Sequence, residues 1–128
     1  MIVVVVAPLG EFRDGLTSLI SVIPDINEVS TTEYLDRAID YVEDHCPDLL
    51  ITITDRLETT TLSKIKMMKV SCQQLKVIAF VQQPDMVAES ISGDVDILLP
   101  QYAKANLITK AITSLLPDKQ VIEENGDK

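Results

Sequence analysis

The chain has 128 residues, 46% of them hydrophobic, which suits one globular domain with a single core. Eleven Lys and Arg against twenty Asp and Glu give a net charge of −9, which argues against direct nucleic-acid binding by this chain. The longest apolar stretch, residues 1–9, is too short to cross a bilayer and lacks the features of a secretory signal. We therefore expect a cytoplasmic protein that does not contact membranes.

Cysteine and histidine are too scarce for a structural zinc site, which normally takes four such ligands. The three residues of these types are Cys46, Cys72 and His45. We expect both cysteines to act as small hydrophobic residues in or near the core, with a redox role as the alternative. His45 is expected at the end of a helix, where it faces solvent or interacts favourably with the helix dipole. No cofactor is indicated.

The first half of the chain alternates between strand and helix patterns. Ile2–Val6 is a β-branched run typical of a strand buried on both faces. A helical stripe follows and ends at Pro24; it consists of Phe12, Leu16, Leu19, Ile20 and Ile23. Ile26–Ser30 is a shorter, more polar strand suited to a sheet edge. Thr31 or Thr32 is expected to cap the next helix, whose stripe is Leu35, Ala38, Ile39 and Val42 and whose end is marked by His45 and Pro47.

The second half continues the alternation. Leu49–Ile53 is the third strand, and a helix begins at about Thr61, which is expected to cap it. The fourth strand is Leu75–Val81, and a short helix then opens at Pro84 or Asp85 and closes at Gly93. Val95–Leu99 is the fifth strand. The last helix ends at Pro117 and carries Leu107, Ile108, Ala111, Ile112, Leu115 and Leu116.

Strand–helix alternation at this spacing predicts an α/β fold with one doubly wound, five-stranded parallel sheet between two helical layers. The expected strand order is the flavodoxin-like 2-1-3-4-5, which places the more polar second strand at an edge. Residues 1–117 form the predicted domain. Residues 118–128 are polar and are expected to be a flexible acidic tail or the start of a linker.

Ligands of such sheets bind beyond the carboxyl ends of the strands. In this sequence the segments at that edge lack the Gly-rich loop of a phosphate site and the converging carboxylates of a magnesium site. Asp55 with Arg56 is a candidate residual polar site, and the alternative is that both are solvated loop charges.

Three motifs in order resemble the receiver (CheY-like) domain of two-component response regulators, closest to the LuxR/NarL-type receivers. Val6–Leu16 is similar to the family's V-D-D-H-P-L-F-R-E-G-L, and residues 47–53 are similar to P-D-L-V-L-L-D. Residues 93–100 correspond without gaps to G-A-D-G-Y-L-L-K. The resemblance covers roughly residues 1–117 and implies the fold predicted above.

The departures from the family pattern fall on its chemical positions. The resemblance implies that the two magnesium-binding acids correspond to Ala7 and Pro8, and that the phosphoacceptor Asp corresponds to Ile53. It likewise aligns the phosphoryl-binding Ser/Thr with Val81 and the charge-neutralising Lys with Pro100. Metal and Lys neutralise the charge in such phosphoryl transfer, so these replacements predict a degenerate pocket with neither metal nor catalysis.

We therefore expect a phosphorylation-independent receiver-like module that signals through protein partners and is not an enzyme. A homodimer through the predicted helix 4–strand 5–helix 5 face is one form this would take, since receivers commonly associate there. Its candidate residues are Ile91, Ile97, Lys104, Leu107 and Lys110.

Two alternatives stay open. The chain could be the N-terminal regulatory domain of a LuxR-type DNA-binding response regulator cut from a longer protein, and a natural stop after Lys128 would argue against this. It could instead be a small flavodoxin-like ligand-binding protein, although it has five aromatic residues and no flavin-type phosphate loop.

Overall fold

The computed structural model describes residues 1–55, 57–82 and 93–115. The helix predicted between residues 84 and 93 therefore falls almost wholly outside the described residues, as do Leu116, Pro117 and the predicted tail 118–128. No helix in the described ranges is long and apolar enough to cross a membrane, and the longest, α3, has 13 residues.

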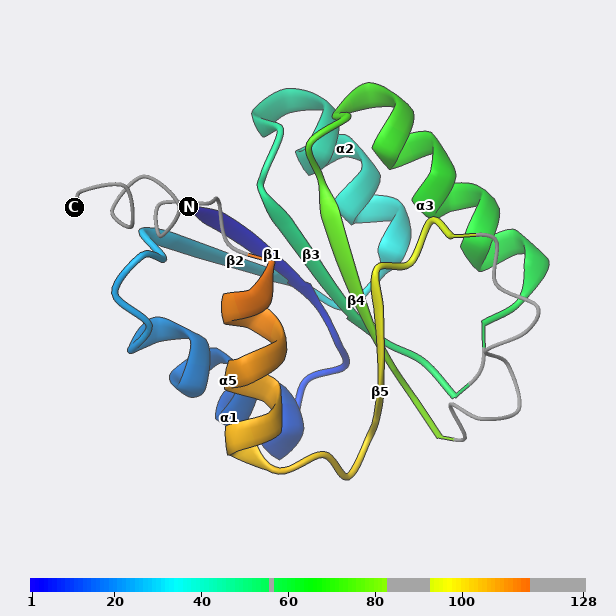
Figure 1. Cartoon of the computed structure of the whole chain (residues 1–128). Helices are drawn as coiled ribbons and strands as arrows, with labels where there is room; N and C mark the ends of the chain where they lie inside the picture. Colours follow the sequence, from blue (N-terminus) through cyan, green and yellow to red (C-terminus); the bar gives the residue numbers. More distant parts are fainter. Residues whose placement is uncertain (56, 83–92, 116–128) are drawn as a thin grey trace, which may run out of the picture.

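Five parallel strands form one sheet in the order β2-β1-β3-β4-β5, which confirms the predicted fold class (Figure 1). The strands are β1 (Ile2–Val6), β2 (Glu28–Thr32), β3 (Leu49–Ile53), β4 (Lys76–Val81) and β5 (Ile97–Pro100). β1 pairs with both β2 and β3, so Val4 lies opposite Ser30 on one side and Leu50 on the other. As predicted, the more polar β2 lies at an edge of the sheet.

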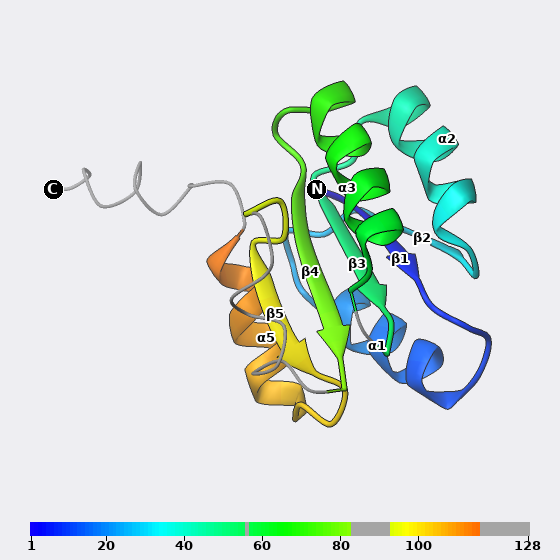
Figure 2. The ribbon, with the colours of Figure 1, turned by 90° about the vertical axis from the view of Figure 1, so that its right-hand side faces the viewer.

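Helices cover both faces of this sheet, as Figures 1 and 2 show. The described helices are α1 (Glu11–Ser21), α2 (Leu35–His45), α3 (Thr59–Ser71) and α5 (Ala105–Ser114). α1 and α5 lie on one face, and α2 and α3 lie on the other. Right-handed crossovers between parallel strands place helices on both faces here, because the chain reverses its direction across the sheet after β2.

Alternate residues of the strands feed two separate hydrophobic clusters because successive strand side chains point to opposite faces. Under α1 and α5 lie Val3, Val5 and Phe80, and the ring of Phe80 meets that of Phe12 edge-on at 5.4 Å. Under α2 and α3 lie Val4 and Val6. Both clusters consist of buried hydrophobic side chains, which hold the sheet and the helices together.

Several local predictions were wrong. The fifth strand spans Ile97–Pro100 and not Val95–Leu99. The second strand spans Glu28–Thr32, two residues later than predicted, because Ile26 is held in a turn in which its N–H donates to the carbonyl of Ile23. Thr31 and Thr32 pair with β1, so they do not cap α2, whose N-cap is Tyr34. Thr61 lies inside α3, and the N-cap there is Glu58 without a side-chain hydrogen bond.

The two cysteines form a disulfide, so the prediction of two free hydrophobic cysteines was wrong. Cys46 follows α2 and Cys72 follows α3, and each directly precedes one of the neighbouring strands β3 and β4. Two equivalent helix ends packed side by side thus bring the Cα atoms to 5.5 Å. Cys72 is buried, as expected, whereas Cys46 is exposed.

The amino ends of the strands are held by two carboxylates. Asp48, just before β3, accepts a hydrogen bond from the backbone N–H of Ile2 at 2.8 Å. Asp96, just before β5, accepts one from the N–H of Val77 at 2.8 Å and forms an ion pair with Lys69 at the same distance. Both carboxylates therefore act as structural acceptors between neighbouring strands.

Candidate functional site

The five positions that the resemblance assigned to the reactive pocket lie at the carboxyl ends of four strands. Ala7 and Pro8 follow β1, Ile53 ends β3, Val81 ends β4 and Pro100 ends β5. Val81 and Pro100 are direct register partners across β4 and β5. Because all strands are parallel, their carboxyl ends lie together at the end of the sheet to which the arrowheads point in Figure 2. This end is called the carboxyl edge below.

The described residues at these strand ends offer no group of three ligands for a cation of the magnesium type. None of the five side chains carries a polar atom, and Ala7 and Val81 are buried. Magnesium binds through one or two carboxylates with water, and the described carboxylate nearest in sequence to these strand ends is the exposed Asp55. Across residues 1–55, 57–82 and 93–115, no three acidic, His or Cys residues could share a metal ion. The described residues therefore do not fit a magnesium site of the kind that the resembling family carries.

A side-chain amide joins the loops after β3 and β5 at this edge. The Gln101 amide nitrogen (Nε2) donates to the carbonyl of Thr54 at 3.0 Å and lies 3.5 Å from Oδ1 of Asp55. The Gln101 backbone N–H also donates to the carbonyl of Val81 at 3.0 Å. Gln101 therefore anchors the end of β5 to the end of β4 and to the loop after β3. Sequence reasoning missed this role, since a single Gln after a strand belongs to no motif.

A guanidinium stands beside the loop that follows β1. Arg13 Nη1, on the half-buried side of α1, donates to the carbonyl of Ala7 at 3.3 Å. On the other side of the same loop, the N–H of Leu9 donates to Glu33 Oε2 at 3.4 Å. The fixed positive charge of Arg13 disfavours a second cation at Ala7 by simple repulsion.

Only one residue of the predicted polar site belongs to the described part of the chain. Asp55 is exposed and close to the Gln101 amide, whereas Arg56 lies outside the described residues. His45 is exposed at the end of α2, as expected, and stacks on Tyr41 with ring centroids 4.2 Å apart. The stacking on Tyr41 and a contact with the backbone carbonyl of the same residue account for the position of the His45 imidazole.

The predicted interaction face is described along β5 and α5. Lys104, Leu107 and Lys110 are exposed at intervals of three residues, so they share one side of the helix. Ile97 is partly buried and packs against the cluster under α1 and α5. Ile91 lies outside the described residues.

A shallow apolar groove runs between α1 and α5, with a volume of about 540 Å³. Its floor includes Phe12, Leu16 and Ile108, and the exposed ring of Tyr102 stands beside it. Polar groups are few and come from Glu11, Ser18 and Gln101. This composition is typical of sites for small apolar ligands.

No protein-family model and no curated protein matches this sequence. Solved structures do match. A LuxR-family DNA-binding response regulator from Staphylococcus aureus superposes with a TM-score of 0.73 at 16% identity, over 89% of this chain and 97% of that one. The isolated REC domain of RcsB from Salmonella enterica serovar Typhimurium gives 0.74 at 18% identity, over 90% and 87%.

One further similar structure has a different description. A putative pilus assembly-related protein from Burkholderia pseudomallei superposes with a TM-score of 0.72 at 13% identity, over 90% of this chain and 88% of that one. At such identities the likeness establishes the fold and leaves function to be argued from the site. The chain therefore has the fold of a response-regulator receiver domain.

Proposed function

We propose that this chain is a phosphorylation-independent, receiver-like signalling module of a two-component-type system, acting through protein contacts and without enzymatic activity. The observation that carries the proposal is the carboxyl edge of the sheet. There Ala7, Pro8, Ile53, Val81 and Pro100 stand where the family resemblance puts the reactive groups.

Phosphoryl transfer to a carboxylate requires charge neutralisation and precise placement, supplied by a metal and a cationic side chain. Ala7 and Pro8 provide no carboxylate for a metal, and Pro100 provides no ammonium group. Asp55 lies two residues beyond the acceptor position, and the amide of Gln101 is already within 3.5 Å of it. A carboxylate without these partners has no means of stabilising the transferred group.

Acetyl phosphate with Mg²⁺ tests the proposal directly. We expect the intact mass of the protein to stay unchanged under conditions that phosphorylate a receiver with a complete pocket, which serves as the positive control. A phosphoryl adduct that forms on the native chain and disappears in Asp55→Asn would contradict the proposal.

We further propose that the partner includes a second copy of this chain, docked through the predicted helix 4–strand 5–helix 5 face. On the described part of that face, α5 keeps Leu107 42% exposed between two exposed lysines, Lys104 and Lys110. An apolar residue within a charged rim is the usual pattern of a protein interface.

Sedimentation equilibrium measures this self-association. Leu107→Asp is expected to weaken the dimer at least tenfold. Val22→Asp, at a still more exposed position that caps the end of α1, is expected to leave it unchanged. A native chain that stays monomeric at high protein concentration would exclude the dimer.

The regulatory domain of a LuxR-type DNA-binding regulator is the alternative reading of the same fold. Its support is that solved structures of this fold include LuxR-family DNA-binding response regulators. Sequencing the messenger RNA beyond the Lys128 codon tests it, because such a regulator requires a continuing reading frame that encodes a helix-turn-helix domain.

A second candidate function, binding of a small apolar ligand, is favoured by the groove between α1 and α5. Titration with the fluorescent probe anilinonaphthalene sulfonate is expected to saturate, and Leu19→Gln on the groove wall is expected to weaken that binding. Equal binding by Leu19→Gln and the native chain would assign the probe to another surface.

We also propose a cytoplasmic location, for which the acidic composition and the short apolar stretches give the support. Cell fractionation with an antibody to the native chain tests it, and recovery in the membrane or secreted fraction would contradict it.

A further inference from the structure

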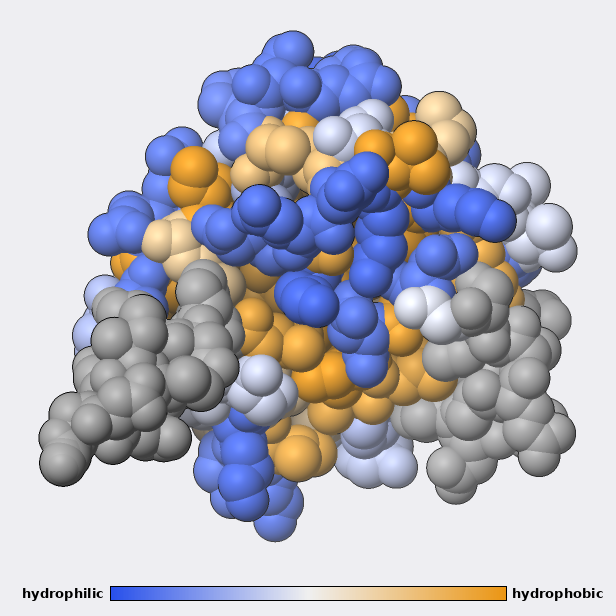
Figure 3. All heavy atoms as spheres, turned by 45° about the horizontal axis from the view of Figure 1, so that its top comes forward, coloured by the Kyte–Doolittle hydropathy of each residue, from blue (hydrophilic) through white to orange (hydrophobic). Residues whose placement is uncertain are grey.

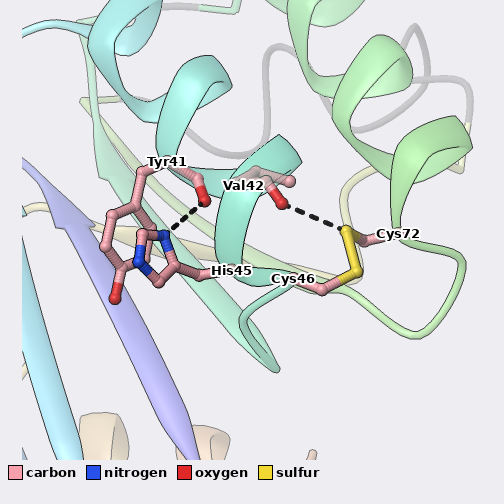
Figure 4. Close-up of a disulfide and its surroundings, with 5 residues drawn as sticks. All are labelled: Tyr41, Val42, His45, Cys46 and Cys72. Atoms are coloured by element: carbon pink, nitrogen blue, oxygen red, sulfur yellow. Dashed lines mark hydrogen bonds between the residues drawn. A yellow bond between two sulfur atoms is a disulfide. The ribbon is translucent and has the colours of Figure 1, made fainter.

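The disulfide joins the ends of two neighbouring helices at the opposite edge of the sheet from the candidate site. Cys46 is the C-cap of α2, Cys72 is the C-cap of α3, and the two are separated by 26 positions in the sequence. Figure 4 shows the bond bridging the two helix ends, with Val42 beside it. The covalent loop thus encloses β3 and α3.

The two cysteine residues differ in their exposure to solvent. Cys46 is exposed, whereas Cys72 is 3% exposed and belongs to the hydrophobic cluster under α2 and α3. A hollow of about 510 Å³ adjoins the bond and is lined by Cys46, Pro47, Val70, Ser71, Cys72, Gln73 and Gln74. Figure 3, which brings this end of the molecule forward, shows mostly hydrophilic residues over the helix ends. A water-soluble thiol therefore approaches the bond from the side of Cys46.

The surroundings also suit the reduced form. Cys72 Sγ lies 3.3 Å from the carbonyl oxygen of Val42, so a thiol at this position has a hydrogen-bond acceptor in place. The same carbonyl accepts the backbone N–H of Cys46 at 2.9 Å, and a carbonyl oxygen has two lone pairs for two such donors. The thiol of Cys46 would face water. Neither sulfur is left as an unpartnered buried group when the bond opens.

The fold around the bond is held by other interactions. The backbone N–H of Cys72 donates to the carbonyl of Met68 at 2.9 Å, and β3 pairs with β4 along its whole length. The buried side chains of Ala38, Val42, Ile65 and Met68 join the two helices. These contacts do not depend on the sulfur–sulfur bond, so the helix pair stays packed without it.

We propose that Cys46 and Cys72 are a reversible dithiol–disulfide couple, a redox site that is separate from the pocket at the carboxyl edge. Its reaction partners are low-molecular-weight thiols and their disulfides. This assignment is independent of whether the chain accepts a phosphoryl group.

The exchange proceeds in two balanced steps. An external thiolate attacks Sγ of Cys46, the Cys46–Cys72 bond breaks, and the Cys72 thiolate leaves and takes a proton from solvent. A second external thiolate then attacks the external sulfur of the mixed disulfide, which releases the thiolate of Cys46. Two electrons pass to the protein, two external thiols become one external disulfide, and the reverse sequence re-forms the bond.

A redox titration of the native full chain tests the couple. The protein is equilibrated with reduced and oxidised glutathione at defined ratios, and the exchange is stopped with acid. The free thiols are then alkylated, and mass spectrometry counts the alkylated cysteines. We expect two thiols to appear together and to be lost again on reoxidation. The backbone amide NMR spectrum is expected to remain that of a folded protein, with shifts confined to the segments around Cys46 and Cys72. Reduction that occurs only together with global unfolding, or not at all, would overturn the proposal.

Single substitutions test the difference between the two sulfurs. In Cys72→Ala, the remaining thiol of Cys46 is expected to react with a maleimide at a rate close to that of a free peptide thiol. In Cys46→Ala, the buried thiol of Cys72 is expected to react at least tenfold more slowly. Equal rates in two folded variants would contradict the proposed point of attack, and the titration of the native chain decides the matter if either variant fails to fold.

Discussion

The two ends of the sheet use their polar residues in opposite ways. At the amino end, Asp48 and Asp96 bind backbone N–H groups of neighbouring strands, and a disulfide joins the two helices that lead into β3 and β4. At the carboxyl end, where sheets of this fold bind ligands, four strands finish in aliphatic or proline side chains. The described side-chain hydrogen bonds there include those of Gln101 and Glu33, which both join segments that follow strands.

Under the two proposals above, the amino end is the end of the molecule that reacts. The disulfide at the amino end is partly open to solvent, whereas Ala7 and Val81 at the carboxyl end are buried and chemically inert. The two hydrophobic clusters hold the strands together, so the fold does not require the reactive groups that the proposal takes to be absent.

The largest expected effect concerns the disulfide. Reducing the disulfide opens the covalent loop, so the unfolded chain gains conformational entropy. For a loop of this length, the expected loss in the free energy of unfolding is about 3.5 kcal/mol. Urea denaturation of the oxidised and reduced protein measures the difference. A loss below about 1 kcal/mol would show that the bond contributes little to the amino end.

A smaller effect is expected at the second anchor of the amino end. Asp96→Ala removes the acceptor of the Val77 N–H and the partner of Lys69, and hydrogen bonds to charged groups contribute about 2 kcal/mol. Urea denaturation of this variant is expected to show a loss of that size. Asp44→Ala, an exposed acid on α2, is the matched control and should change stability by less than about 0.5 kcal/mol.

At the carboxyl end the anchor is weaker. Gln101→Ala loses the hydrogen bond to the carbonyl of Thr54, and the expected loss is about 1 kcal/mol. Gln101→Glu places a second carboxylate near Asp55 and is expected to destabilise further, in a way that added salt reduces. If Gln101→Ala lost more stability than Asp96→Ala, the ranking of the two ends would be wrong.

The smallest effect is expected for the ion pair between Lys64 and Asp36, which joins α3 to α2. Its side chains are 38% and 72% exposed, against 20% and 22% for Lys69 and Asp96. Exposed pairs contribute little, so Lys64→Ala should lower stability by about 0.5 kcal/mol or less. The same denaturation series checks this value.

Much of the fold could be predicted from the sequence because buried parallel strands are continuous apolar runs. Ile2–Val6 and Leu49–Ile53 were predicted with the bounds that the structure gives. Positions with weaker patterns were not. The β-branched side chain of Ile26 is typical of a strand. Its turn depends on a backbone hydrogen bond, which side-chain patterns do not predict.

The disulfide and the Gln101 contact arise from tertiary structure. Cys46 and Cys72 are 26 positions apart in the sequence. Their proximity becomes evident only when both are seen to end helices on the same face of the sheet and to precede neighbouring strands. The predicted topology already contained that information. For Gln101, the partners are backbone oxygen and an exposed carboxylate, so residue types alone could not identify them.

The most direct test of the central claim is an amide NMR titration of the native chain with Mg²⁺ and beryllofluoride, which mimics a phosphoryl group on a carboxylate. The account predicts no saturable shift at residues 53–55 or at Gln101. A saturable shift confined to the carboxyl ends of β1, β3, β4 and β5 would show that this edge still binds a metal and a phosphoryl group, and would contradict the account.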